Sequence, residues 1–125
     1  MSTTNILPKQ DIVHGSNTNG SYIKFPDGLM ICWKLVEKTG VKITNTWGSF
    51  YESTSSISLG SWPVTFTAAP TVFLSVAHTN SGITVYPEQP QSVTASSCGT
   101  TYAAAPTSSS SAAIAFTVMG IGYWK

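Results

Sequence analysis

The chain contains no arginine, and only 9% of its 125 residues are charged. Its net charge of +1 is not gathered into a basic cluster, so the electrostatic signature of a nucleic-acid-binding or anionic-lipid-binding protein is missing. No apolar run approaches the roughly 20 residues needed to span a bilayer, and the first ten residues, MSTTNILPKQ, lack the order of a signal peptide. We therefore expect a chain made in the cytosol, with no nucleic acid partner and no membrane insertion.

Carboxylates are also scarce. The chain has five, of which Asp11 and Asp27 fall in a linker and in a tight turn, while Glu37, Glu52 and Glu88 are isolated from one another in sequence. A glycoside hydrolase needs two carboxyl groups on either side of one substrate bond, and the sequence shows no such pair. We expect no catalytic residue and no enzyme activity.

Histidine and cysteine each occur only twice. His14 and His78 have no neighbour at metal-ligand spacing. Three copies of one histidine around a threefold axis would supply a site, but exposed loop histidines are the favoured reading. Cys32 and Cys98 are more consistent with reduced, buried thiols than with a disulfide, because one pair without a secretion signal is rarely bridged. The sequence predicts no metal and no cofactor.

Hydroxyl side chains are abundant instead, with 18 serines and 17 threonines. Short apolar or alternating runs are separated by turn residues, and no segment has a helical stripe, which is typical of an antiparallel all-β domain. We expect one domain, an antiparallel β-sandwich of about six to eight strands. Residues 1–20 are polar and without periodicity, so they are interpreted as a linker.

A hairpin is the most definite local prediction. Tyr22–Phe25 and Leu29–Val36 flank Pro-Asp-Gly, which suits a type I turn closed by a glycine bulge. Leu29–Trp33 is apolar throughout and therefore places apolar side chains on both faces of its strand. One set, with Leu29, Ile31 and Trp33, and the other, with Met30 and Cys32, must be divided between the core and a subunit interface, and the sequence leaves open which set goes where.

The remaining strands are less sharply marked. Lys42–Tyr51 is expected to form an irregular strand or an exposed aromatic loop, and Thr107–Ala113 a loop before the last strand. The expected strands are Val64–Thr67, a long strand after Pro70, Ile83–Tyr86, Val93–Ser96 and Ile114–Met119.

Aromatic residues lie among asparagine, serine and threonine, a mixture that suits sugar binding because rings stack on a pyranose while hydroxyls and amides bond its rim. Trp62, Phe66 and Phe73 are expected in the core. The glycan-binding candidates come from stretches rich in turn residues: Asn45, Trp47, Tyr51, His78, Asn80 and Tyr86.

Two blocks resemble a known family. NGSYIKFPDGLMICWK resembles the start of C-terminal domains of bacteriophage tail-fibre proteins, and the segments WPVTF, APTV and GIGYWK resemble later parts of the same domains. The likeness covers about residues 19–125. Lys34 and Leu35, which follow Ile-Cys-Trp, depart from the small residues expected there. The second block also resembles, more distantly, the H-type lectins.

The resemblance implies a homotrimeric, noncatalytic tip that binds polysaccharide or lipopolysaccharide on a bacterial surface, joined to the rest of a tail fibre in a virion and assembled in the host cytoplasm. Residues 1–20 would end the fibre shaft, residues 21–125 would form the tip with hairpin 22–36 on the shaft side, and the sugar-reading loops would lie at the opposite pole. Residues expected in the core or trimer interface are Tyr22, Ile23, Phe25, Leu29, Met30, Ile31, Trp33 and Trp124. The alternative is a purely structural β module of the fibre or virion.

Overall fold

A computed structural model describes residues 11–80 and 82–125, and these residues contain strands and no helix, so no helix there is able to cross a membrane. Residues 1–10, the first half of the expected linker, lie outside the described residues. The ten strands are β1 (Val13–Asn17), β2 (Gly20–Lys24), β3 (Leu29–Trp47), β4 (Phe50–Ser53), β5 (Ile57–Ser58), β6 (Thr71–Thr79), β7 (Tyr86–Pro87), β8 (Thr100–Thr101), β9 (Ala103–Ala105) and β10 (Ser109–Tyr123).

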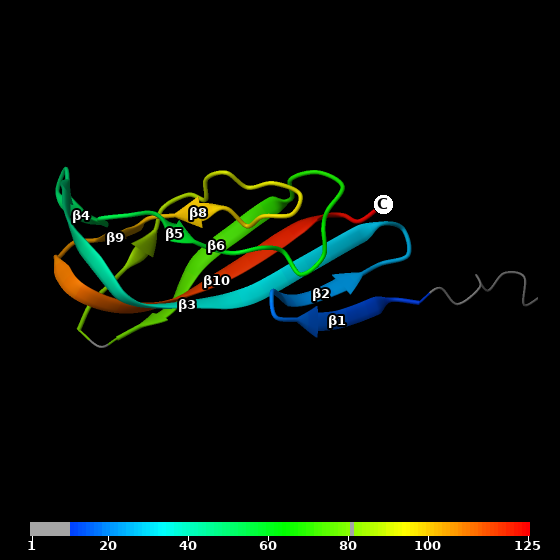
Figure 1. The fold of residues 1–125 in the computed structure, drawn as a ribbon, viewed down its shortest axis with the longest axis horizontal. Coiled ribbons are helices and arrows are strands. Elements are labelled where there is room, and N and C mark those ends of the chain that lie inside the picture. The colour runs from blue at the N-terminus through cyan, green and yellow to red at the C-terminus, as the bar shows by residue number, and fades with distance from the viewer. Residues whose placement is uncertain (1–10, 81) are drawn as a thin grey trace, which may run out of the picture.

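One antiparallel sheet of eight strands dominates the fold. The long strands β3 and β10 run side by side along the molecule, with β6 on the far side of β10 and the β1–β2 hairpin beside the first part of β3 (Figure 1). The last part of β3 pairs instead with β4, which continues to β9 and β7. β5 and β8 form a separate two-stranded ribbon. The all-β, antiparallel class is confirmed, but the strands belong mainly to one curled sheet and number more than the expected six to eight.

The predicted hairpin is present. The amide of Gly28 donates to the carbonyl of Phe25 at 3.0 Å, and the amide of Phe25 donates to the carbonyl of Leu29 at 2.8 Å. Gly28 has φ 112°, a conformation that glycine adopts without steric cost, and Asp27 Oδ1 accepts from the amide of Leu29 at 3.1 Å. Local residue types therefore determine this turn.

The alternation along β3 decides which side chains face the core. Met30 and Cys32 are fully buried, whereas Trp33 is 41% exposed. Successive residues of a strand point to opposite faces, so Ile31 and Trp33 lie on the outward face. The sequence predicted that this strand ends near Val36, but it continues through Lys34 and Leu35 to Trp47.

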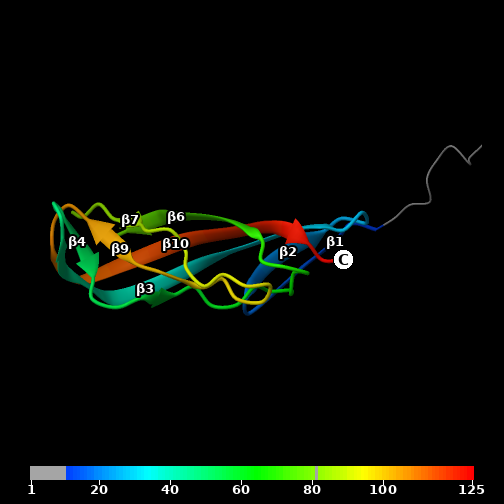
Figure 2. The same cartoon turned by 90° about the horizontal axis from the view of Figure 1, so that it is seen from above.

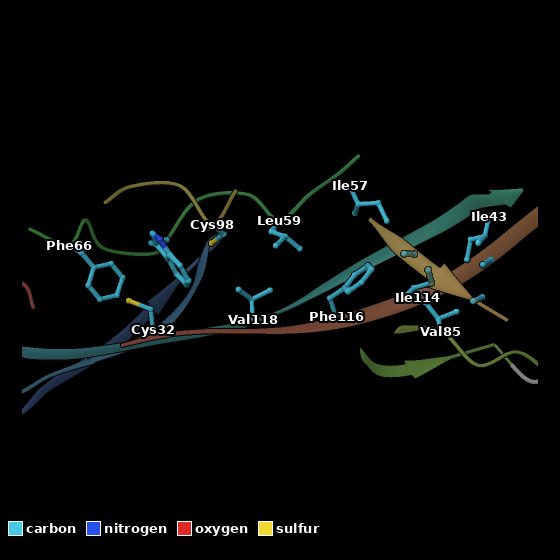
Figure 3. Packing of buried hydrophobic residues seen from close by; sticks show 14 of the residues in the cluster. Cys32, Ile43, Ile57, Leu59, Phe66, Val85, Cys98, Ile114, Phe116 and Val118 are labelled. Carbon is cyan, nitrogen blue, oxygen red and sulfur yellow. The ribbon is translucent and has the colours of Figure 1, made fainter. Parts of the chain in front are cut away.

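Two irregular segments cover the inward face of the sheet. Residues 57–66 run antiparallel to residues 95–101, as shown by the bonds from the amide of Leu59 to the carbonyl of Gly99 and from the amide of Phe66 to the carbonyl of Ala95. Figure 3 shows Leu59 and Cys98 from this layer facing side chains of β3 and β10. The core residues are Met30, Cys32, Ile43, Ile57, Leu59, Trp62, Phe66, Val85, Cys98, Ala103, Ala105, Ala112, Ile114, Phe116 and Val118.

Two glycines of the C-terminal strand make room for the largest of these rings. A Cβ atom at Gly120 would lie 2.7 Å from the Trp62 ring, and one at Gly122 would lie 2.9 Å from the Phe66 ring. The two rings meet edge to face at 5.5 Å. The Gly-Ile-Gly sequence near the end of the chain is thus explained by packing.

Several expected strands are wrong. Residues 64–67 and 93–96 form no strand. The amides of Trp62 and Phe66 donate to the carbonyls of Ser96 and Ala95, but the backbone around Pro63 is irregular, so no continuous ladder forms. Only Tyr86 of the expected strand 83–86 is in β7. Thr107–Ala113 was expected to be a loop, but its residues from Ser109 onward belong to β10. Phe73 was expected in the core but is 52% exposed, since alternation in β6 turns Val72 and Leu74 inward.

The sheet begins before the boundary expected at residue 20. Val13–Asn17 pairs with β2 in full register, from Val13 opposite Lys24 to Asn17 opposite Gly20. The C-terminus is also tied down, because Trp124 Nε1 donates to the carbonyl of Phe25 at 2.9 Å and the amide of Trp124 donates to the carbonyl of Gly28. Hairpin β2–β3 and the C-terminus therefore meet at one end of the molecule.

Candidate functional site

The two ends of the molecule differ in character. The β3–β4 hairpin, β7 and β9 lie at one end, whereas the C-terminus and the first described residues lie at the other, and both views agree (Figures 1 and 2). We refer to the end with β4, β7 and β9 as the distal end. It carries the aromatic residues that the sequence singled out.

A tight turn presents two of these rings. Trp47 at the end of β3 is paired with Phe50 at the start of β4, and the two residues between them include Gly48 with φ 59°, as in a type II′ turn. Directly opposed residues of an antiparallel pair point to the same face. The rings of Trp47 and Phe50, 55% and 38% exposed, are therefore neighbours on one face.

The pairing of β4, β9 and β7 extends this face. Glu52 is opposite Ala104, and Ala104 is opposite Tyr86, so the three side chains form a row across the sheet. Phe50 stands two residues before Glu52 and shares its face, and its ring centroid is 6.2 Å from that of Tyr86, at an interplanar angle of 57°. The small Ala104 side chain leaves space between the larger ones.

The result is an open hollow of about 600 Å³, within the size range of sugar and small-molecule sites. We call it the aromatic hollow. It is lined by Trp47, Gly48, Phe50, Tyr86, Pro87, Glu88, Gln89 and Ala104. Exposed rings beside glutamine and glutamate offer stacking surfaces together with hydrogen-bonding groups, which is the arrangement suited to a pyranose.

A carboxyl pair borders the aromatic hollow. Glu88 and Glu52 lie within hydrogen-bonding reach of each other, and Glu88 Oε2 is buried without a hydrogen-bond partner among the described residues. Desolvation, which is the largest effect, and the neighbouring carboxyl group of Glu52 raise the pKa of Glu88 to about 7. The backbone holds Glu88 in place, since its amide donates to the carbonyl of Tyr102 and its carbonyl accepts from Thr101 Oγ1 at 2.6 Å.

The structure brings together some of the candidate residues and separates others. Trp47 and Tyr86 line the aromatic hollow, and Asn45 lies beside it on the same face because it pairs with Glu52. Tyr51 has the opposite orientation and packs against the core.

His78 and Asn80 do not line the aromatic hollow. His78 is exposed on β6, and Asn80 Oδ1 accepts the amide of Ala113 at 3.0 Å, which ties the end of β6 to β10. Sequence reasoning missed Phe50, Glu52, Glu88 and Gln89 as site residues. Phe50 stood inside the aromatic run TNTWGSFY, but no local signal pairs Glu52 with Glu88.

Apolar side chains also gather on the outward face of β3, β10 and β6. The pairing aligns Trp33, Met119 and Phe73 in one row, and Ile23, Ile31 and Ile121 in the next. Leu29 and Tyr123 form a further pair. A second hollow, of about 750 Å³, lies on this face and shares Pro87, Glu88 and Gln89 with the aromatic hollow. We call the surface around Trp33, Phe73 and Met119 the apolar sheet face.

The other residues expected in the core or interface divide accordingly. Tyr22 and Trp124 pack against the core, and Phe25 is half-buried in the hairpin turn.

Cys32 and Cys98 are free and buried, and desolvation raises the pKa of both thiols, that of Cys32 to about 11. Among residues 11–80 and 82–125, no three acidic, histidine or cysteine side chains converge as metal ligands.

No protein-family model matches the chain, and no curated protein matches it by sequence. Its fold is similar to that of solved pyocin fibres. The R1 pyocin fibre of P. aeruginosa, comprising C-terminal residues 323–701, is 19% identical with a TM-score of 0.57 over 97% of this chain and 30% of that one. An N-truncated R1-type pyocin tail fibre is 18% identical with a TM-score of 0.56, over 97% of this chain and 93% of that one. At these identities the likeness shows the fold, and this chain spans less than a third of the first.

Proposed function

We propose that the chain is the receptor-binding tip of a tail fibre, which attaches a phage or phage-like particle to a polysaccharide or lipopolysaccharide on a bacterial surface. The aromatic hollow is the observation that carries this proposal. Its three rings, those of Trp47, Phe50 and Tyr86, are exposed around one hollow, and they stand at the end opposite the first described residues. The motif resemblance and the pyocin-fibre fold are consistent with a fibre tip.

The tip acts without catalysis in this proposal. Among the residues that the structure describes, the one carboxyl pair at the distal end is Glu52 and Glu88, whose carboxyl groups lie within hydrogen-bonding reach of each other. Glycosidases hold their two carboxyl groups about 5 Å or more apart, so that a substrate bond, with or without a water molecule, fits between them. Incubation with surface polysaccharide from an adsorbing strain is expected to release no oligosaccharide.

We further propose that the tip is a homotrimer and that the apolar sheet face is its subunit interface. Phe73 is 52% exposed in the single chain, and Trp33 and Met119 adjoin it. Contiguous exposed apolar surface on a folded domain marks an interaction site, and obligate interfaces are apolar in this way. This assigns Ile31 and Trp33 to the interface and leaves Met30 and Cys32 in the core.

The purely structural module remains the alternative, because an apolar sheet face would serve it equally well. The two functions differ in what the aromatic hollow does. Replacing Trp47, Phe50 and Tyr86 together with alanine is expected to abolish adsorption to bacterial cells while the oligomer stays intact. The control is His78→Ala, which removes an exposed side chain outside the hollow.

The adsorption measurement separates the outcomes. Unchanged adsorption of the triple variant, with a normal sedimentation coefficient, would exclude the aromatic hollow as the receptor site. Absence of binding by the unmodified protein to every bacterial surface and glycan tested would favour the structural module. The distant likeness to H-type lectins stays a prediction.

A further inference from the structure

The charges around the aromatic hollow are all of one sign. Among the described residues, its lining contains no lysine and no histidine, and the one carboxyl group in it is that of Glu88, backed by Glu52. Gln89 adds an uncharged donor and acceptor. A ligand that enters this hollow therefore meets apolar rings, an amide and a carboxyl pair, and no cation.

The cations of the distal half lie elsewhere. Lys38 and Lys42 line a different hollow, of about 360 Å³, between β3 and the segment 53–58, where the other side chains are mostly hydroxyls. An acidic sugar would find opposite charge in that hollow and none in the aromatic one. Lys38 and Lys42 thus lie outside the lining of the aromatic hollow.

We propose that the aromatic hollow selects sugars without acid groups, namely neutral, N-acetylated or amino-bearing pyranoses, and that the Glu52–Glu88 pair excludes uronic acids and phosphorylated sugars. This inference rests on the proposed function and names the ligand class of the same site. The rings of Trp47, Phe50 and Tyr86 supply the attraction, and the carboxyl pair supplies the selectivity.

The repulsion follows from the position of the pair. Two carboxyl groups within hydrogen-bonding reach share a proton when one of them has its pKa raised to about 7, so the pair keeps a net negative charge at neutral pH. A carboxylate or phosphate placed a few ångströms away adds like charge at a site that is partly shielded from water. An ammonium group on the sugar is attracted to the pair instead, because its positive charge favours ionisation of both glutamates.

The test uses the full chain in its native assembly on an array of bacterial glycans with matched members: a neutral or N-acetylated sugar, its uronic acid counterpart and its phosphorylated counterpart. The unmodified protein is expected to bind the neutral member at least about tenfold more tightly than either acidic one, a factor that one modest charge repulsion supplies. The double variant Glu52→Gln and Glu88→Gln keeps the hydrogen-bonding shape without the charge. It is expected to lose most of this preference.

Asp11→Asn is the matched control, because Asp11 lies near Trp124 and Lys125 at the opposite end, and its replacement should leave the preference unchanged. If the double variant is unstable, Glu88→Gln alone mimics the protonated form of the pair and is expected to lower the preference in part. Its thermal unfolding verifies the fold.

The possible results distinguish the inferred ligand class from the proposed receptor-binding function on which it rests. Binding to acidic glycans that Trp47→Ala and Tyr86→Ala abolish would overturn the ligand class and leave the receptor function intact. Acidic glycan binding that depends instead on Lys38 and Lys42 would move the site to the other hollow. No binding to any glycan or bacterial surface would contradict the proposed function itself.

Discussion

The carboxyl group of Glu88 lies within hydrogen-bonding reach of that of Glu52, across the short strand β9 that pairs with the strands on either side. One oxygen of Glu88 is buried there without a partner among the described residues. Two carboxylates this close repel each other when both are ionised, so the folded state retains a proton that the unfolded chain loses. Stability and ligand selectivity are thereby linked through the same pair.

Stability is expected to fall as the pH rises through the window set by Glu88. The folded pKa is raised from 4.5 to about 7, so the folded state binds more protons than the unfolded state between these values. The loss should be fully developed above pH 7 and amount to about 1–2 kcal/mol, discounted from the full shift because the pair lies near the surface. Urea unfolding at pH 5, 6, 7 and 8 measures it.

Glu88→Gln should flatten that dependence and stabilise the protein at pH 8, since the amide cannot ionise. Asp11→Asn should keep the slope of the unmodified protein. Equal slopes for the unmodified protein and Glu88→Gln would show that another group governs the pH dependence.

Gly120→Ala is expected to destabilise the fold by about 1–3 kcal/mol, the usual cost of overpacking a core. Three atoms of the Trp62 ring would lie 2.7, 2.9 and 3.1 Å from the added carbon, and Trp62 is held by its bond from Nε1 to the carbonyl of Thr94. Ser110→Ala, at an exposed position of the same strand, should change stability by less than about 0.5 kcal/mol. Chemical denaturation compares the two.

Energetic coupling between Gly120 and Trp62 tests whether contact with the Trp62 ring causes this destabilisation. In the background of Trp62→Phe, whose ring is smaller, Gly120→Ala should cost less than it does in the unmodified protein. Strictly additive effects of the two substitutions would mean that the glycine is required for another reason.

Assembly is expected to depend on the apolar sheet face. If the proposed trimer is held by this face, Trp33→Ser together with Phe73→Ser should convert it into monomers, because both side chains are exposed in the single chain and would be buried only by a neighbouring subunit. Sedimentation velocity measures the change. Trp47→Ser alters a side chain of similar exposure at the distal end and should remain trimeric. A trimer that survives the double substitution would place the interface on another surface.

Both cysteines should be unreactive in the native protein. Cys32 and Cys98 are fully buried, and the raised pKa values keep them as thiols rather than as reactive thiolates. A chromogenic thiol reagent at pH 8 is expected to titrate neither until denaturant is added, and then to titrate two per chain. Rapid labelling of one cysteine without denaturant would reveal local opening of the covering layer.

Signals confined to neighbouring residues were sufficient for part of this structure. Pro26, Asp27 and Gly28 specify the hairpin turn because their backbone preferences act within the turn itself. The alternation in Val72–Val76 likewise identifies a strand, and the run around Trp47 identifies exposed aromatic residues. These features follow from amino-acid types and spacing alone.

The faces of the strands depended on contacts between distant segments. The sequence allowed either Met30 or Ile31 to face the core, and the choice follows from the register of β3 against β2 and β10, which brings Met30 beneath the covering layer. The register of β6 against β10 likewise exposes Phe73, although a phenylalanine ring suits a core. A shift of one residue would reverse every such assignment.

The aromatic hollow shows the same division. Trp47 and Tyr86 stand out in the sequence as rings among polar residues, but only the pairing of β4, β9 and β7 places Phe50 beside Tyr86 and Glu52 beside Glu88. Those pairings join segments far apart in the chain, and no local preference encodes them. Residue types therefore supply the chemistry of the site, and the curled sheet assembles it.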